Sequence, residues 1–177
     1  MLAESELPVL LRFGAEMNGK WTKWHSDPEQ YKKAFQLVAK AMHENAPRVK
    51  MVWSPTPDSS ANKRSELYYQ GDEFVDTVGT SSYFTPIYPF NTVSRARNRI
   101  MRIDDLASII LKPLSEFAKA HGKPFMVCEF GAAQTYDDDE VVHKNWKEFQ
   151  EQAVLKMYSQ FVKDFNIRAI CYYNDCM

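Results

Sequence analysis

Glycine is scarce in this sequence, and the few glycines do not form the loop that binds phosphate groups. Only 6 of the 177 residues are glycine, and no predicted strand is followed by a glycine-rich stretch. This absence argues against the open α/β folds that bind nucleotides. Long apolar runs are also missing, since none approaches the roughly 20 residues that a membrane helix needs. The formal net charge of −1 gives no reason to expect nucleic acid or an anionic membrane as a partner.

Cysteines are few as well, and their pattern does not indicate a metal site. The three are Cys128, Cys171 and Cys176, with no Cys-x-x-Cys pair, and the histidines lack the spacing of metal ligands. Because Cys128 and Cys171 lie in apolar runs, both are expected to be buried free thiols. Residues 1–6 lack the basic and apolar regions of a signal peptide. Localisation therefore stays open, with secretion expected if a longer native gene carries such a peptide.

Short apolar runs alternate with amphipathic stretches along the whole chain. Strands are expected at 7–13, 49–54, 74–80, 124–130 and 167–173, and helices from Asp27 to Pro47, over 104–121 with a break near Pro113, and over 142–164. Strands that alternate with helices predict a parallel sheet with helices outside it. The linkers are short, so the sequence predicts one domain over residues 1–177.

Aromatic residues are abundant, at 14% of the chain, and polar and aromatic side chains gather after the predicted strands. Barrel enzymes keep their chemistry in the loops at that end of the strands. We therefore predict an α/β fold of the (β/α)8 TIM-barrel type, present in part, with about five βα units.

Two glutamates stand out by position. Glu16 follows the first predicted strand, and Glu129 ends the fourth within the apolar run 126–130. A carboxylate buried there without a partner is costly, so Glu129 either forms a structural ion pair, for instance with Arg12, or has a function. Two carboxylates that face each other across a barrel mouth suit glycoside hydrolysis, and a separation of about 5–5.5 Å would indicate retention of configuration.

The run from Arg12 to Trp24, RFGAEMNGKWTKW, resembles the fourth-strand signature of glycoside hydrolase family 26. Three further segments are similar to later strands of that family: 52–55 (VWSP), 69–79 (YQGDEFVDTVG) and 129–131 (EFG). The resemblance extends over nearly the whole chain. It implies strands four to eight of a retaining barrel, and an endo-acting hydrolase of β-1,4-mannan or a related β-glycan that needs no cofactor.

The resemblance also implies roles for individual residues. Glu16 corresponds to the general acid/base and Glu129 to the nucleophile. Tyr83 corresponds to a donor to the nucleophile, and the remaining substrate-binding positions are Arg12, Asn18, Trp21, Trp24 and Trp53. The expected partner is a β-linked polysaccharide or oligosaccharide.

The chain departs from the family pattern at several points. Ala15 stands where the family usually has His directly before the acid/base, Ser81 and Ser82 replace a common Asp and Gly, and the first three strands are absent. These departures leave open an alternative, a non-catalytic carbohydrate-binding or structural remnant that self-associates. Its homo-oligomer would form through two exposed strand edges.

Overall fold

The computed structural model describes residues 7–58, 64–85, 87–88, 99–100, 102–132 and 140–173. Five parallel strands form one sheet in the order β1-β2-β3-β6-β7. Their bounds are β1 Val9–Arg12, β2 Val49–Trp53, β3 Thr77–Phe84, β6 Phe125–Ala132 and β7 Ile167–Tyr172. The helices are α1 Pro28–Asn45, α2 Ile103–Ile110, α3 Lys112–Ala120, α4 Glu140–Lys156 and α5 Val162–Asp164, with a π-helical turn, Met157–Phe161, between the last two. Short 3₁₀ helices span Lys23–Ser26 and Ser65–Tyr68.

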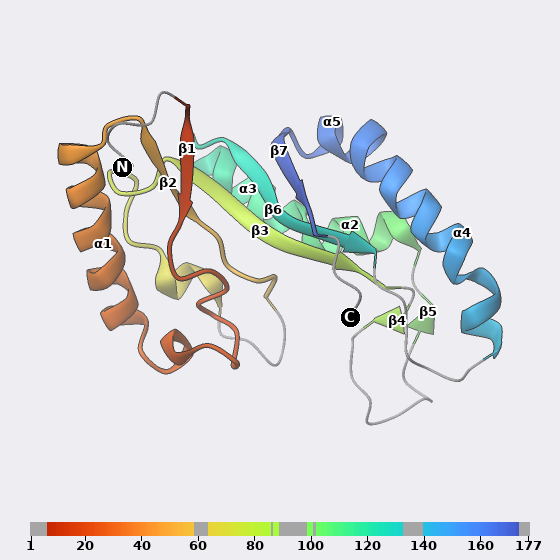
Figure 1. Ribbon diagram of the computed structural model, residues 1–177. Coiled ribbons are helices and arrows are strands. Elements are labelled where there is room, and N and C mark those ends of the chain that lie inside the picture. The colour runs from red at the N-terminus through yellow and green to blue at the C-terminus, as the bar shows by residue number, and fades with distance from the viewer. Residues whose placement is uncertain are drawn as a thin grey trace.

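The sheet curls into part of a barrel, with helices along its outer side (Figure 1). The prediction of a partial (β/α)8 fold with about five βα units is confirmed. Two very short strands, β4 Ile87–Tyr88 and β5 Arg99–Ile100, form a separate antiparallel pair that the sequence did not predict. Among the described residues, no helix combines the length and apolarity needed to cross a membrane.

The predicted ends of the helices agree with the structure. The Asp27 side chain accepts a hydrogen bond from the backbone N–H of Gln30 at 2.9 Å, and Pro28 opens α1, as expected for a capped helix start. Gly122, with φ +64°, follows α3 at the position of a C-terminal glycine. The predicted break near Pro113 is confirmed, because α2 ends at Ile110 and α3 begins at Lys112.

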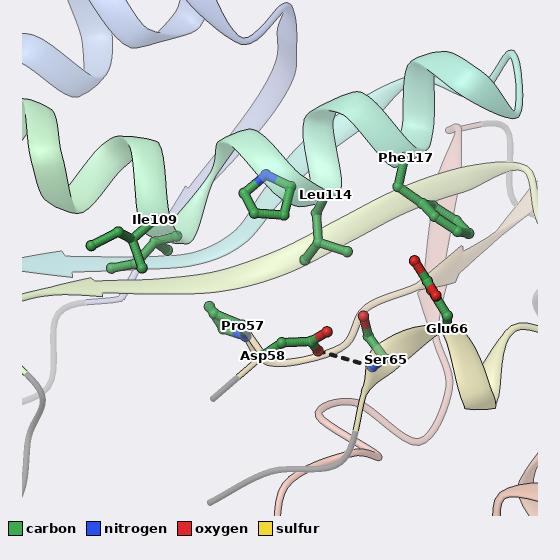
Figure 2. A pocket seen from close by; sticks show the side chains of 9 residues that line it. Pro57, Asp58, Ser65, Glu66, Ile109, Leu114 and Phe117 are labelled. Carbon is green, nitrogen blue, oxygen red and sulfur yellow. Dashed lines mark hydrogen bonds between the residues drawn. The ribbon is translucent and has the colours of Figure 1, made fainter. Parts of the chain in front are cut away.

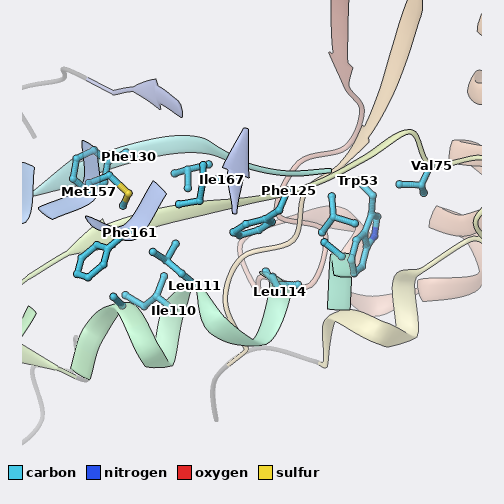
Figure 3. Close-up of a cluster of buried hydrophobic side chains, with 14 of the residues drawn as sticks. Trp53, Val75, Ile110, Leu111, Leu114, Phe125, Phe130, Met157, Phe161 and Ile167 are labelled. Carbon is cyan, nitrogen blue, oxygen red and sulfur yellow. The ribbon is translucent and has the colours of Figure 1, made fainter. Parts of the chain in front are cut away.

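The main core lies between the sheet and the helices. Trp53, Leu114, Phe125 and Phe161 are among its buried side chains, and Figure 3 shows them between β3, β6 and the helices. Side chains alternate between the faces of a strand, so a second, smaller layer forms on the opposite face of the sheet. Val52, Met126 and Cys128 make up this inner layer, with Ala169 packed against it.

A small cavity of about 90 Å³ lies on the helix side of the sheet, between the loop after β2 and the α2–α3 junction (Figure 2). Its wall includes Pro57, Ile109 and Leu114. Asp58 borders the cavity and accepts a hydrogen bond from the backbone N–H of Ser65 at 2.9 Å. This contact joins Asp58 to the start of the following 3₁₀ helix.

Three predictions need correction. The third strand was expected at 74–80 and spans Thr77–Phe84 instead, because Asp76 binds the backbone N–H of Met51 with its side chain before regular pairing begins. The helix expected over 142–164 contains the π-helical turn. Cys128 is buried as expected, but Cys171 is exposed because it lies on the outermost strand of the described sheet. Cys176 lies outside the described residues.

Candidate active site

Glu129 lies beside a bulge in β6. Thr80 on β3 pairs with Val127, whereas the next residue, Ser81, pairs with Glu129, so Cys128 is an extra residue in the ladder. Bulges of this kind redirect a side chain and are common next to active sites. Cys128 packs into the inner layer, and the Glu129 carboxylate also faces the inner side, where it meets side chains from β1 and β3.

Arg12, at the end of β1, binds residues on β3 and β6 and the residue that follows β2. Its Nη1 donates to Glu129 Oε1, its Nε donates to Ser54 Oγ at 3.0 Å, and its Nη2 donates to Ser81 Oγ at 2.8 Å. Ser54 and Ser81 are buried, and the Arg12 and Glu129 side chains are mostly buried. A guanidinium suits this place because its donors have a fixed planar arrangement. The ion pair of Glu129 with Arg12, one of the two alternatives for Glu129, is therefore present.

Tyr83 supplies the second donor to Glu129. Its hydroxyl donates to Glu129 Oε2 at 2.6 Å. Burial raises the pKa of Tyr83, and the Glu129 hydrogen bond and charge raise it further, so the phenol keeps its proton. Tyr83 was expected in a loop after the strand and lies on β3 itself.

The Glu129 carboxyl is held in its ionised form. Burial alone raises the pKa of Glu129, but the hydrogen bonds from Tyr83 and Arg12, together with the Arg12 charge, more than offset burial and lower it. A carboxylate with both oxygens fixed by donors is both charged and oriented. These are the properties that a nucleophile at a sugar carbon needs.

Glu16 lies in the turn after β1 with an unusual backbone conformation. Its φ is +56°, which residues other than glycine rarely adopt outside functional or strained sites. Its backbone N–H donates to the Ser54 carbonyl at 2.8 Å, and its own carbonyl accepts from Gly19 at 2.8 Å. Trp21 Nε1 donates to Glu16 Oε2 at 3.0 Å. The charge of Glu16 also contributes to the raised pKa of Tyr83, so the two carboxylates belong to one electrostatic site.

Asn18 and Trp24 contact neighbouring parts of the fold and so stabilise the turn of Glu16. Asn18 is fully buried, and its side-chain amide both donates to the carbonyl and accepts from the N–H of Thr56, each at 2.9 Å. This pair ties the turn after β1 to the loop after β2. Trp24 is half-buried and packs on Phe13 and Tyr31, with ring centroids 6.1 and 5.5 Å apart.

Trp53 does not reach the carboxylates. It is fully buried on the helix side, with its ring 4.9 Å from that of Tyr69 and 5.2 Å from that of Phe117. Met51 and Trp53 share the core face of β2, so the inner positions are Val52 and Ser54.

Sequence reasoning missed three residues of the site. Ser54 and Ser81 bind Arg12, and Tyr173, just after β7, lies edge-on to Tyr83 with ring centroids 6.0 Å apart. A signal for Ser81 was available, because it precedes Tyr83 by two residues and a strand places such pairs on one face. Ser54 follows Trp53 and takes the opposite face for the same reason.

The arrangement therefore offers one carboxylate fixed by two donors and a second, half-buried carboxylate in the turn after β1. A family model, described as glycosyl hydrolase family 26, matches residues 1–166. The chain belongs to glycosyl hydrolase family 26. The predicted resemblance is thereby confirmed over most of the chain.

Two curated relatives and one solved structure show what the chain is similar to. It is 29% identical over 99 residues to a mannan endo-1,4-beta-mannosidase of Bacillus subtilis (strain 168), which is 51% of this chain and 27% of that protein. It is 26% identical over 178 residues to a beta-1,3-xylanase of an Alcaligenes species, which is 92% of this chain and 33% of that protein. A double mutant of the Cellulomonas fimi endo-beta-1,4-mannanase shares the fold, with a TM-score of 0.64 at 20% identity over 95% of this chain and 35% of its own. The family 26 chain thus spans about a third of the length of these relatives.

Proposed function

We propose that this part of a family 26 barrel belongs to a retaining, endo-acting glycoside hydrolase, with Glu129 as nucleophile and Glu16 as general acid/base. The observation that carries the proposal is the pair of donors, Arg12 and Tyr83, that holds Glu129 ionised beside the turn of Glu16. The names of the two curated relatives support a β-linked polysaccharide backbone as the substrate. We propose β-1,4-mannan or a related β-glycan.

In the first step of the proposed reaction, a Glu129 oxygen attacks the anomeric carbon of the sugar. The bond from that carbon to the glycosidic oxygen breaks, and the proton of Glu16 moves to the departing oxygen. The product is a sugar ester of Glu129 and a shortened chain with a free hydroxyl. Each oxygen of Glu129 accepts one of these two hydrogen bonds, so the attacking oxygen keeps a second lone pair for the anomeric carbon.

In the second step, water attacks the same carbon. Glu16, now ionised, takes a proton from the water, and the ester bond to Glu129 breaks. Two displacements at one carbon restore the original configuration. Arg12 and Tyr83 stabilise the Glu129 carboxylate as it leaves, which is the role of donors placed before the reaction begins.

The remaining side chains are proposed to form and support the sugar site. Trp21 is 59% exposed beside Glu16 and offers a flat apolar face to a sugar ring. Trp24 and Asn18 support the turn of Glu16 from within the fold. Trp53 is assigned to the core because its ring has no exposed surface.

The test is release of reducing sugar from linear β-1,4-mannan, β-1,3-xylan and mixed-linkage β-glucan, with Glu16→Gln as background. We expect release above that background, and the preferred polymer identifies the substrate. Equal release by wild type and Glu16→Gln on every polymer would contradict the assignment of Glu16.

A non-catalytic unit that self-associates is a second candidate. The observation that favours it is the exposure of both outer strands of the described sheet, where Leu10 on β1 is 49% and Tyr172 on β7 is 53% exposed. Sedimentation velocity on the assayed sample separates the two. Concentration-dependent assembly without sugar release supports this candidate, and a monomer that releases sugar contradicts it.

A further inference from the structure

The exposed ring of Trp21 is held in place from two sides. At one end, its indole Nε1 donates to Glu16 Oε2 at 3.0 Å. Beneath it lies Gly19, where an added Cβ would come within 2.5 Å of Trp21 Cζ2. Gly19 also donates its backbone N–H to the Glu16 carbonyl at 2.8 Å, so the glycine that seats the ring belongs to the same turn as the carboxylate. Trp21 is exposed, yet its indole N–H has a fixed partner. This contact indicates a role beyond stacking on a sugar ring.

We infer that Trp21 is a positioning residue for Glu16, acting through its indole N–H rather than only through its aromatic face. This inference rests on the proposed function of Glu16 as the acid/base. The N–H engages Oε2, which leaves Oε1 as the oxygen that exchanges the proton with the glycosidic oxygen. The backbone N–H of Glu16 donates to the Ser54 carbonyl, and its side chain accepts from Trp21. Glu16 is therefore held both at its backbone and at its carboxyl group.

The same N–H helps the proton to leave. As Glu16 gives its proton to the departing oxygen, negative charge develops on its carboxylate, and a donor already in place stabilises that charge without reorganisation. A hydrogen bond to an ionised group contributes more than one between neutral groups. The rate increase from this hydrogen bond is largest for a leaving group that must be protonated and smallest for one that departs without a proton.

Trp21→Phe is the appropriate change, because it removes the N–H and keeps an aromatic ring over Gly19. The ratio of kcat/KM for a poor leaving group to that for a dinitrophenyl leaving group is expected to fall about 10- to 100-fold. If Trp21 acts only by stacking, both substrates lose kcat/KM equally and the ratio stays constant, which would overturn the inference.

A second measurement does not depend on turnover. The chain has 4 tryptophans, and the indole N–H cross-peak that disappears in Trp21→Phe identifies Trp21 in a ¹H–¹⁵N spectrum. We expect this peak to lie at a different position in Glu16→Ala, which removes the acceptor of the Trp21 hydrogen bond, while the other indole peaks keep their positions. A Trp21 peak at the same position in both proteins refutes the contact. If wild type hydrolyses neither substrate, the proposed function fails, while the spectrum still decides the role of Trp21.

Discussion

Glu129→Ala is expected to lower kcat for β-glycan hydrolysis by at least about 10⁴-fold, the order of effect seen when a nucleophile is removed. The carboxylate is the group that attacks the sugar, and Arg12 and Tyr83, which hold it, cannot replace it. The fold should persist, because Glu129 faces the inner side of the sheet, away from the main core. Circular dichroism and steady-state kinetics on one preparation measure both.

Azide distinguishes Glu129 from Glu16 in a matched pair of variants. With a dinitrophenyl glycoside, azide can enter the space left in Glu129→Ala and attack the anomeric carbon directly, which gives a sugar azide of inverted configuration. In Glu16→Ala, Glu129 still forms the ester, and azide then displaces it, which gives the retained configuration. The same configuration from both variants would contradict the assigned roles.

Arg12→Met is expected to lower kcat by on the order of a hundredfold and to shift its pH dependence. Arg12 is one of two donors to Glu129 and the one that carries a positive charge. It also binds Ser54 and Ser81, so its loss loosens the contacts between β1 and β3 at the site. A pH series of kcat/KM measures both effects.

The direction of the pH shift follows from the pKa of Glu129. Burial raises that pKa, and Tyr83 and Arg12 lower it below its ordinary value, so wild type keeps Glu129 ionised well into the acid range. Without Arg12, burial is opposed only by Tyr83, and the pKa rises. The acid limb of the profile should therefore move to higher pH.

Tyr83→Phe is the control for this shift. It removes one neutral donor and leaves Arg12 in place, so kcat should fall by only about tenfold. Arg12→Lys is expected to lie between the other two variants, because a lysine keeps the charge but cannot reach all three partners. An acid limb that does not move in Arg12→Met would show that Arg12 does not control the ionisation of Glu129.

Much of the fold was predictable because local signals agreed with it. Asp27 and Pro28 marked the start of α1, Gly122 marked the end of α3, and Pro113 marked the break before it. The apolar run 126–130 located β6 and placed Glu129 near its end. The acidic residue within an apolar strand was itself the signal, since such a residue needs partners.

The remaining errors arise where tertiary contacts override local pattern. Ser81 and Ser82 follow the expected end of the strand at residue 80, but both continue β3 because they pair with Glu129 and Phe130 on β6. The bulge at Cys128 depends on the register between β3 and β6, which no local signal reveals. Trp53 was grouped with the site by the family resemblance, although the alternation of side chains along β2 turns it toward the core.

For Trp21, the sequence predicted the residue but not the orientation of its side chain. The family resemblance implied that Trp21 binds substrate, but its hydrogen bond to Glu16 depends on how the turn folds around Gly19. The positive φ of Glu16 and the contact with Ser54 create that turn. A sequence pattern names the residues of such a turn without their orientation.

The most direct test of the account is to trap the sugar ester. The protein is incubated with a 2-deoxy-2-fluoro glycoside that carries a dinitrophenyl leaving group, digested, and analysed by peptide mass spectrometry. The account predicts one added sugar on the peptide that contains Glu129, and none in Glu129→Ala. A sugar attached to a different residue, or substrate turnover with no attached sugar, would contradict it.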